Sequence, residues 1–335
     1  ADCILLVTEP EQWTPYESGV MAEAEKRKSS VLIVVNKVDL GIPSPAFMER
    51  LKREAGRVVP LSCLDPVGRD RAMELLKRHL IEMAPDDVIE TPTLIGDLMP
   101  PGGLAILVVP IDLQAPKGRL ILPQVQTIRD ALDNDASVLI VKERELAAAL
   151  TYLNRRPDLA VCDSQVILKV SADVQSDIPC TTFSILFARQ KGNLSVAAAG
   201  AATIEALRPG DRVLIAEACS HHPLQDDIGR IKIPRWLSQY VGGELKIDFS
   251  AGRDYPEGVE RYRLIIHCGG CMLTRREMLA RLQMAKEASV PVTNYGLAIS
   301  FTQGVIRRVL SPFPSALIAF DRRIDEIRRE RPGDC

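Results

Sequence analysis

The chain has 335 residues, of which 46% are hydrophobic and 26% are charged, and its formal net charge is −2. This composition is typical of a globular protein with two or three domains. The nearly balanced charge gives no sign of a polyanionic partner, and no apolar run approaches the ~20 residues that span a bilayer. We therefore expect no nucleic-acid partner and no membrane association.

The chain contains eight cysteines, which do not form the disulfide framework of a small secreted protein. No secretory signal peptide opens the sequence. Free thiols, together with the metal site considered below, imply a reducing compartment. We therefore expect a cytoplasmic protein.

Residues 1–85 alternate buried strands with helices, which is typical of an α/β fold with a parallel sheet. The expected strands are 3–7, 31–35 and 57–61, and the expected helices are 16–28, 45–55 and 67–83. A polar loop follows the second strand, and it carries the first candidate site.

Asn36-Lys37-Val38-Asp39 resembles the guanine-specificity motif N-K-x-D of small GTPases. The Asp39 carboxylate can accept two hydrogen bonds from guanine, which adenine does not offer. Asn36 would tie the loop together, and the Lys37 stem would pack along the purine. Ser62-Cys63 stands where such GTPases direct a backbone N–H toward guanine O6. We therefore interpret residues 1–85 as the C-terminal part of a Ras-like GTPase domain that binds GTP.

The phosphate-binding motifs of a GTPase do not occur in the sequence. There is no G-x-x-x-x-G-K-S/T loop, and no D-x-x-G precedes Asn36. These motifs would supply the phosphate cradle and the Mg²⁺ ligands. We infer that the N-terminal part of the GTPase domain is missing here, so Mg²⁺ and GTP turnover belong to the full-length protein. We expect no GTP hydrolysis by the chain as given.

A Pro-containing linker at 84–92 is expected to separate this domain from a small α/β domain at 92–188. The expected strands are 104–109, 137–141, 159–162 and 182–186; one helix is expected to end near 133, and others to cover 143–154 and 164–170. No catalytic set is evident in this layer. A sheet this small is expected to bury an edge in a partner.

A third α/β domain is expected over residues 192–330. The expected strands are 212–216, 244–249, 263–266 and 290–294, and the expected helices are 197–207, 228–240, 297–310, 314–328 and one that begins after Thr274. Two of these strands lead into the second candidate site.

The second candidate site is a pair of Cys/His clusters. Cys219 and His221 follow the strand at 212–216, and His267-Cys268-Gly269-Gly270-Cys271 follows the strand at 263–266. If both strands belong to one parallel sheet, both clusters leave it at the carboxyl edge, where open α/β sheets bind ligands. Two thiol-rich turns would then face a common crevice.

Thiolates and imidazoles in this pattern are typical of a metal site. A structural zinc site uses four such ligands, whereas iron–sulfur clusters are held mainly by cysteines. Gly269 and Gly270 permit a close approach of the backbone to an inorganic core. Thr274 and Glu277 have the spacing of a capping box, which would place a positive helix end near an anionic cluster.

Three features together resemble the family of [FeFe]-hydrogenase maturation GTPases. They are the C-x-H…H-C-x-x-C pattern, the N-K-V-D motif, and the run from Asp112 to Gln124 with Ala115-Pro116-Lys117-Gly118-Arg119 inside it. The resemblance covers the whole chain apart from the P-loop portion. It implies a scaffold with GTPase, dimerisation and cluster-binding domains, which forms a homodimer by joining sheets.

The resemblance also implies that Cys219, Cys268 and Cys271 hold a [4Fe–4S] cluster with a labile fourth site. The candidates for that site are His221, which we favour, His267, Asp226 and Asp227. Members of the family accept a diiron precursor with CO and cyanide ligands from radical-SAM maturases and deliver it to apo-[FeFe]-hydrogenase. GTP is expected to control partner association.

Two other functions are compatible with these residues. A GTPase with a structural zinc domain would contain zinc and stay colourless after anaerobic reconstitution. An enzyme that uses the cluster as a redox or Lewis-acid centre would turn over a small molecule without any hydrogenase.

Overall fold

A computed structural model describes residues 3–26, 29–83, 92–111, 119–218, 227–252 and 255–330. The chain divides into two compact units, Ala1–Pro92 and Thr93–Cys335. Among the described residues, no helix is both long and apolar enough to cross a membrane. The α/β class with parallel sheets expected from the sequence is confirmed.

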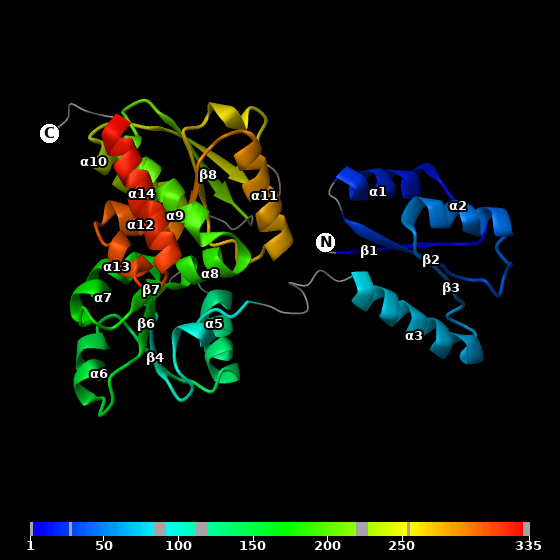
Figure 1. The fold of residues 1–335 in the computed structure, drawn as a ribbon, viewed down its shortest axis with the longest axis horizontal. Coiled ribbons are helices and arrows are strands. Elements are labelled where there is room, and N and C mark those ends of the chain that lie inside the picture. The colour runs from blue at the N-terminus through cyan, green and yellow to red at the C-terminus, as the bar shows by residue number, and fades with distance from the viewer. Residues whose placement is uncertain are drawn as a thin grey trace. The chain divides into compact units, whose positions relative to one another are not determined.

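The first unit is a three-stranded parallel sheet in the order β1-β2-β3, with α1 and α2 on one face and α3 on the other (Figure 1). Its elements are β1 (Cys3–Thr8), α1 (Pro15–Lys26), β2 (Ser30–Val35), α2 (Pro45–Ala55), β3 (Val58–Pro60) and α3 (Pro66–Met83). Strand β2 is central, and its side chains are buried from Val31 to Val35 because both faces are covered. The Ser44 hydroxyl accepts the Phe47 N–H and so caps α2.

The second unit begins with a four-stranded parallel sheet in the order β5-β4-β6-β7. Its strands are β4 (Leu104–Val108), β5 (Ser137–Val141), β6 (Leu159–Cys162) and β7 (Cys180–Thr182). Its helices are α5 (Leu122–Asp133), α6 (Leu146–Tyr152), α7 (Ile167–Asp173) and α8 (Phe183–Lys191). Strand β5 is the more exposed edge, since the side chains of β7 are all buried.

The strand predicted at 182–186 is wrong. Strand β7 ends at Thr182, whose hydroxyl accepts the Ile185 N–H and caps α8. Phe183, Ile185, Leu186 and Phe187 are all buried, so α8 is apolar on nearly every side. A short helix buried all round lacks the 3.6-residue periodicity that separates a helix from a strand.

A second parallel sheet follows, in the order β11-β10-β8-β9. Its strands are β8 (Arg212–Glu217), β9 (Lys246–Ala251), β10 (Leu264–His267) and β11 (Val292–Asn294). Its helices are α9 (Leu194–Ala202), a π-helix (Ile228–Lys232), α10 (Ile233–Val241), α11 (Arg275–Glu287), α12 (Tyr295–Thr302), α13 (Ile306–Leu310) and α14 (Pro314–Glu330). The helix expected at 297–310 is therefore two helices, which separate at Gly304 with its left-handed φ of 74°.

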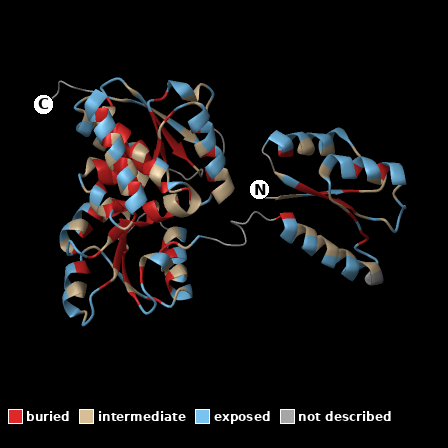
Figure 2. Ribbon diagram, in the orientation of Figure 1, coloured by how far each residue is buried: buried red, intermediate tan, exposed pale blue. Residues whose placement is uncertain are grey.

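One hydrophobic core runs through the second unit, from Leu94 to Ile327 (Figure 2). It includes strand residues of both sheets, such as Ile106 and Ile266, and the buried faces of α8, α9, α12 and α14. The two sheets of this unit are therefore held together by shared packing.

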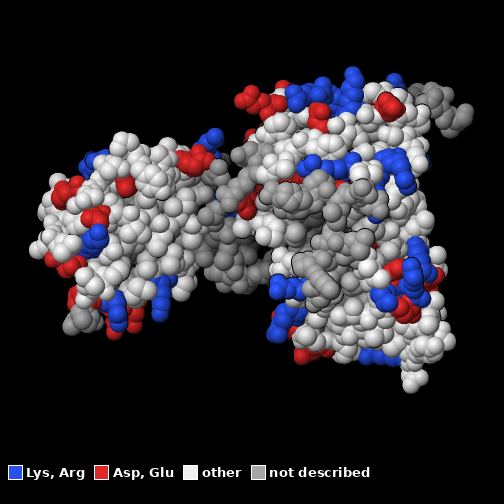
Figure 3. Space-filling view, turned by 180° about the vertical axis from the view of Figure 1, so that it is seen from behind, with Lys and Arg blue, Asp and Glu red and all other residues white. Residues whose placement is uncertain are grey.

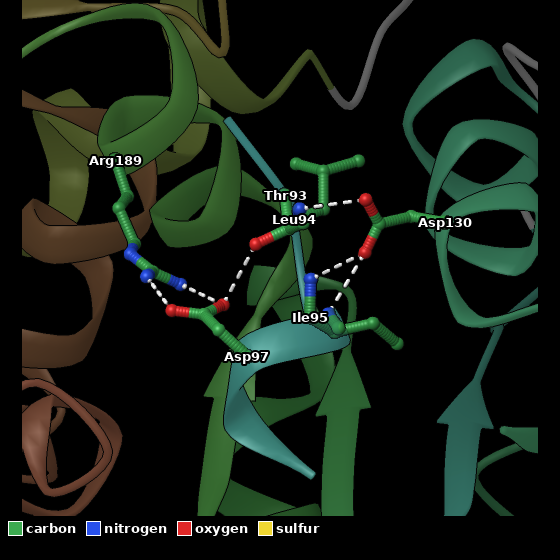
Figure 4. Close-up of polar contacts among 7 residues, drawn as sticks. Thr93, Leu94, Ile95, Asp97, Asp130 and Arg189 are labelled. Atoms are coloured by element: carbon green, nitrogen blue, oxygen red, sulfur yellow. Dashed lines mark hydrogen bonds and ion pairs between the residues drawn. The ribbon is translucent and has the colours of Figure 1, made fainter. Parts of the chain in front are cut away.

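A polar network holds the start of the second unit (Figure 4). The Asp130 carboxylate accepts the backbone N–H groups of Leu94, Ile95 and Gly96 at 2.9, 2.8 and 2.9 Å. Asp97 forms an ion pair with Arg189 on the last turn of α8. These contacts attach the first residues after the linker region to α5 and α8.

Basic and acidic side chains are interspersed over the face of the molecule shown in Figure 3. Elsewhere on the described residues, ion pairs join opposite charges at short range, for example Arg212 with Asp248 and Arg307 with Asp321. Local pairing of this kind weakens any extended field of one sign.

Candidate functional site

Strands β8 and β10 are adjacent and parallel, as expected, with His267 paired to Ala216 in the register. Both therefore end at the same edge of the sheet. The Cys268 N–H donates to the Ala216 carbonyl at 3.0 Å. In the other direction, the Ala218 N–H donates to Cys268 Sγ at 3.2 Å. The residue directly before Cys219 thus lies against the Cys268 sulfur.

The turn after β10 keeps its two thiols partly exposed. Cys268 and Cys271 are both of intermediate burial. A Cβ built on Gly269 would meet no atom of the described residues within 4 Å, so these residues leave the turn open there. Gly270 has φ +60°, which favours glycine. The capping box of α11 is confirmed: the Thr274 hydroxyl accepts the Glu277 N–H at 3.2 Å, and the Glu277 carboxylate accepts the Thr274 N–H at 3.0 Å.

The His267 ring points into the protein and is 2% exposed. Its Nε2 is hydrogen-bonded to the Tyr255 hydroxyl, and its Nδ1 lies 3.5 Å from Arg281 Nη1. Burial, and then the Arg281 charge, lowers the pKa of His267 to about 3. Because Arg281 can only donate, Nδ1 is the acceptor and Nε2 carries the proton in this arrangement. Both ring nitrogens are thus engaged within the protein.

Lys191, the last residue of α8, reaches across to the same turn. Its ammonium donates to the carbonyls of Gly270, Cys271 and Leu273 at 3.0, 2.9 and 2.8 Å. It also lies 5.2 Å from the centre of the Phe187 ring. Burial lowers the pKa of Lys191, while the neighbouring thiols of Cys271 and Cys268 act in the opposite direction. No spacing rule points to this contact, because it joins residues 79 positions apart.

Residues 219–226 lie outside the described part of the chain, and with them Cys219, His221 and Asp226. The two ends of that segment are described. Glu217, 1% exposed, forms an ion pair with Arg230 at 2.9 Å. Asp227, 2% exposed, accepts the Arg230 N–H at 2.8 Å. An ion pair thus joins Glu217 and Arg230, which lie on either side of residues 219–226 in the sequence.

Within the described residues there is no group of three or more Cys, His, Asp or Glu side chains that could hold a metal ion. Two thiols and a backbone N–H aimed at one sulfur are nevertheless present at the sheet edge. Such N–H···S hydrogen bonds, together with adjacent positive charge, suit a thiolate-bound iron–sulfur cluster. The residues that are described fit that group.

The N-K-V-D loop follows β2 at the carboxyl edge of the first sheet. The Asn36 N–H donates to the Thr8 carbonyl at 2.8 Å, and the Asn36 Oδ1 atom is buried without a hydrogen-bond partner. Lys37 has φ +62° and pairs with Glu9. Asp39 is exposed. A buried acceptor without a partner in a polar loop is consistent with a ligand that supplies the missing donor.

Ser62 and Cys63 lie beside this loop, because β3 pairs with β2. The Val38 N–H donates to the Leu61 carbonyl at 3.4 Å, which joins the two segments. Ser62 is 5% exposed and its hydroxyl accepts the Leu64 N–H at 3.1 Å, whereas Cys63 is exposed. The structure thus places the expected base-recognition residues at one edge of the sheet.

Comparison with protein families gives two matches in the second unit. The model of the hydrogen maturase F dimerization domain matches residues 94–192, and that of the hydrogen maturase F tetramerization domain matches residues 195–312. The chain belongs to the hydrogen maturase F family. Membership in the hydrogen maturase F family places the protein in hydrogenase maturation, and both matched domains are named for self-association. Neither match includes residues 1–93.

No curated protein matches the chain. Three solved structures are distantly similar. Yeast Rtt107 has 13% identity and a TM-score of 0.27, over 96% of this chain and 71% of that one. A 5,10-methylenetetrahydrofolate dehydrogenase from the silkworm Bombyx mori has 11% identity and a TM-score of 0.21, over 67% and 89%. LpCGTa in complex with UDP has 11% identity and a TM-score of 0.18, over 99% and 96%. These values are too low to support an argument.

Proposed function

We propose that this chain is a scaffold in [FeFe]-hydrogenase maturation, which holds a [4Fe–4S] cluster and delivers a diiron precursor to the apo-hydrogenase. Its domains would be residues 1–85 for guanine recognition, 92–188 for dimerisation and 192–330 for the cluster. The observation that carries the proposal is the hydrogen bond from the Ala218 N–H to Cys268 Sγ. This hydrogen bond holds Ala218, the residue before Cys219, against the turn that carries Cys268 and Cys271. The membership of the chain in the hydrogen maturase F family is the second support.

Cys219, Cys268 and Cys271 would bind three irons of the cluster, and the bound cluster would supply one iron with an exchangeable position for cargo. The open space at Gly269 leaves that edge accessible. His267 and Asp227 are both buried and hydrogen-bonded inside the protein. Of the four candidates for the fourth position, His221 therefore stays the preferred one, with Asp226 as the other open choice.

The test is anaerobic reconstitution with iron and sulfide, followed by metal analysis and EPR of the reduced protein. Cys268→Ser and Cys271→Ser should each lose most of the cluster, and added imidazole should change the EPR spectrum of the wild type. Cys3→Ser, which removes a thiol in the first unit, is the matched control. Zinc with no iron in the wild type would favour the structural zinc alternative, and unchanged loading of Cys271→Ser would refute the three-cysteine assignment.

We further propose that residues 1–85 recognise guanine through Asn36, Lys37 and Asp39, with Ser62 and Cys63 beside them. The exposed Asp39 carboxylate and the unpartnered Asn36 Oδ1 support this. Saturation-transfer NMR with guanosine and adenosine can detect the weak binding expected of a nucleoside without phosphates. Guanosine should give the stronger signal and Asp39→Ala should lose it, whereas equal signals from both nucleosides would contradict the proposal. The nucleotide proposed for this site is GTP, with Mg²⁺ as its metal ion.

We propose that the homodimer forms at the edge of β5. This strand is partly exposed, and Ile140 on it is 43% exposed. Leu122, Val125 and Leu132 of the neighbouring α5 are exposed as well. An apolar, uncovered sheet edge is stabilised by pairing with a second copy. Apo-[FeFe]-hydrogenase and the radical-SAM maturases would be the further partners, with the protein acting in the cytoplasm.

A further inference from the structure

The end of α8 contacts the cysteine turn through several groups. The Lys191 ammonium is surrounded by three carbonyls, those of Gly270, Cys271 and Leu273, at 2.8 to 3.0 Å. An ammonium has three N–H donors, so this set satisfies all of them. The Arg275 side chain donates to the Gln190 carbonyl of the same helix end. The cysteine turn is therefore attached to α8 on both sides of Leu273.

Holding a partly buried ammonium at this position costs free energy unless nearby groups stabilise its charge. Desolvation of an ammonium disfavours its charged form, and a methionine of similar length would avoid that cost. The carbonyls compensate it in part. One of these carbonyls belongs to Cys271 itself, so the ammonium is held directly beside the cysteine turn. A positive charge held at this point would stabilise thiolates and an anionic cluster.

We propose that Lys191 is a positioning residue for the cysteine turn, which orders the turn before metal arrives and holds one positive charge beside the cluster. This inference rests on the proposed function, because it assumes that the cluster is bound at Cys268 and Cys271. Groups just outside the ligand set orient the ligands, and their charge and hydrogen bonds adjust affinity and reduction potential. Lys191, at the end of α8, would both orient the cysteine turn and place a charge beside the cluster.

Two substitutions separate the two roles. Lys191→Met removes the charge and the three hydrogen bonds. Lys191→Arg keeps the charge, but a planar guanidinium cannot direct three donors at the three carbonyls. Lys286→Met is the matched control, since it removes one positive charge from an exposed position at the far end of α11.

The first measurement is the loss of iron to a chelator from the anaerobically reconstituted protein, followed by the midpoint potential of the cluster by EPR titration. Lys191→Met should lose iron about tenfold faster and shift the potential to lower values. Lys191→Arg should lose iron faster but keep a potential near that of the wild type. Lys286→Met should behave as the wild type in both. Equal iron loss and equal potential in Lys191→Met and the wild type would overturn the proposal.

The second measurement is hydrogen exchange of the apo protein at the Leu273 amide, which donates to the Gly270 carbonyl at 3.0 Å. Exchange should be faster in both Lys191 variants, and unchanged exchange would refute the ordering of the turn. If Lys191→Met does not fold, iron loss and Leu273 amide exchange in Lys191→Arg decide whether Lys191 orders the turn. A wild type that takes up no iron–sulfur cluster would instead refute the proposed function, while the exchange experiment would still test the contact.

Discussion

Gly200 lies in the last turn of α9, where the helix packs directly on the backbone of β11. A Cβ added to Gly200 would lie 1.9 Å from the Val292 carbonyl oxygen, 2.5 Å from its carbonyl carbon and 3.1 Å from its nitrogen. All three are backbone atoms, so no side-chain rotation relieves the contact. Gly200→Ala is therefore expected to destabilise the second unit.

The magnitude follows from two opposing effects. Alanine is favoured over glycine in a helix interior by about 1 kcal/mol. A normal contact needs a separation of about 3.5 Å, so α9 would have to move by roughly 1.5 Å from β11, which also disturbs its packing against α14. Forcing extra atoms into a packed core costs about 1–3 kcal/mol, and this displacement is at the upper end. We expect a net loss of about 2 kcal/mol, or a Tm lower by roughly 4–8 °C.

Differential scanning calorimetry of the apo protein measures this change. Gly19→Ala is the matched control, because Gly19 is in α1 and a Cβ there would meet nothing within 4 Å. That substitution should stabilise the first unit by about 0.5–1 kcal/mol. The same chemical change is thus expected to have opposite signs at the two sites. A Tm for the Gly200→Ala second unit at or above that of the wild type would show that α9 does not pack this closely on β11.

Three further outcomes are expected. Asp130→Ala should destabilise the second unit by about 3 kcal/mol in urea unfolding, because it leaves three partly buried N–H groups without their acceptor; a loss below about 1 kcal/mol would contradict this. Burial raises the pKa of Asp97, but the hydrogen bond and ion pair with Arg189 outweigh burial, so the pKa is lowered. The pairing contributes under about 1 kcal/mol of stability, which is present above about pH 4 and lost as the pH falls. The loss of stability in Asp97→Asn should therefore shrink in acid, and a loss that is independent of pH would refute this. Ile140→Lys should shift the homodimer toward monomer in sedimentation velocity, and an unchanged dimer would exclude the β5 edge.

Local signals in the sequence predicted most of the elements that carry the candidate sites. Ser137–Val141 and Pro45–Ala55 have the bounds that were expected from the sequence. Thr274 begins α11 as its capping box predicted. The parallel pairing of β8 with β10 followed from the helices between them, and both strands end at one edge of the sheet.

Other features depend on contacts between distant residues and have no local signal. Residues 183–186 are helical because the core encloses α8 on nearly every side, although their apolar run also fits a strand. His267 is adjacent to Cys268 in sequence, yet packing turns its ring toward Tyr255 and Arg281. Local propensity cannot report which way a side chain faces once two layers pack against it.

By itself the sequence determined which residue types stand at the ends of which strands, because strand and helix periods, caps and turns are properties of short segments. The tertiary structure alone decided that Lys191 contacts the cysteine turn and that Glu217 pairs with Arg230. Such contacts form only when the packing of the whole second unit brings separate elements within hydrogen-bond distance.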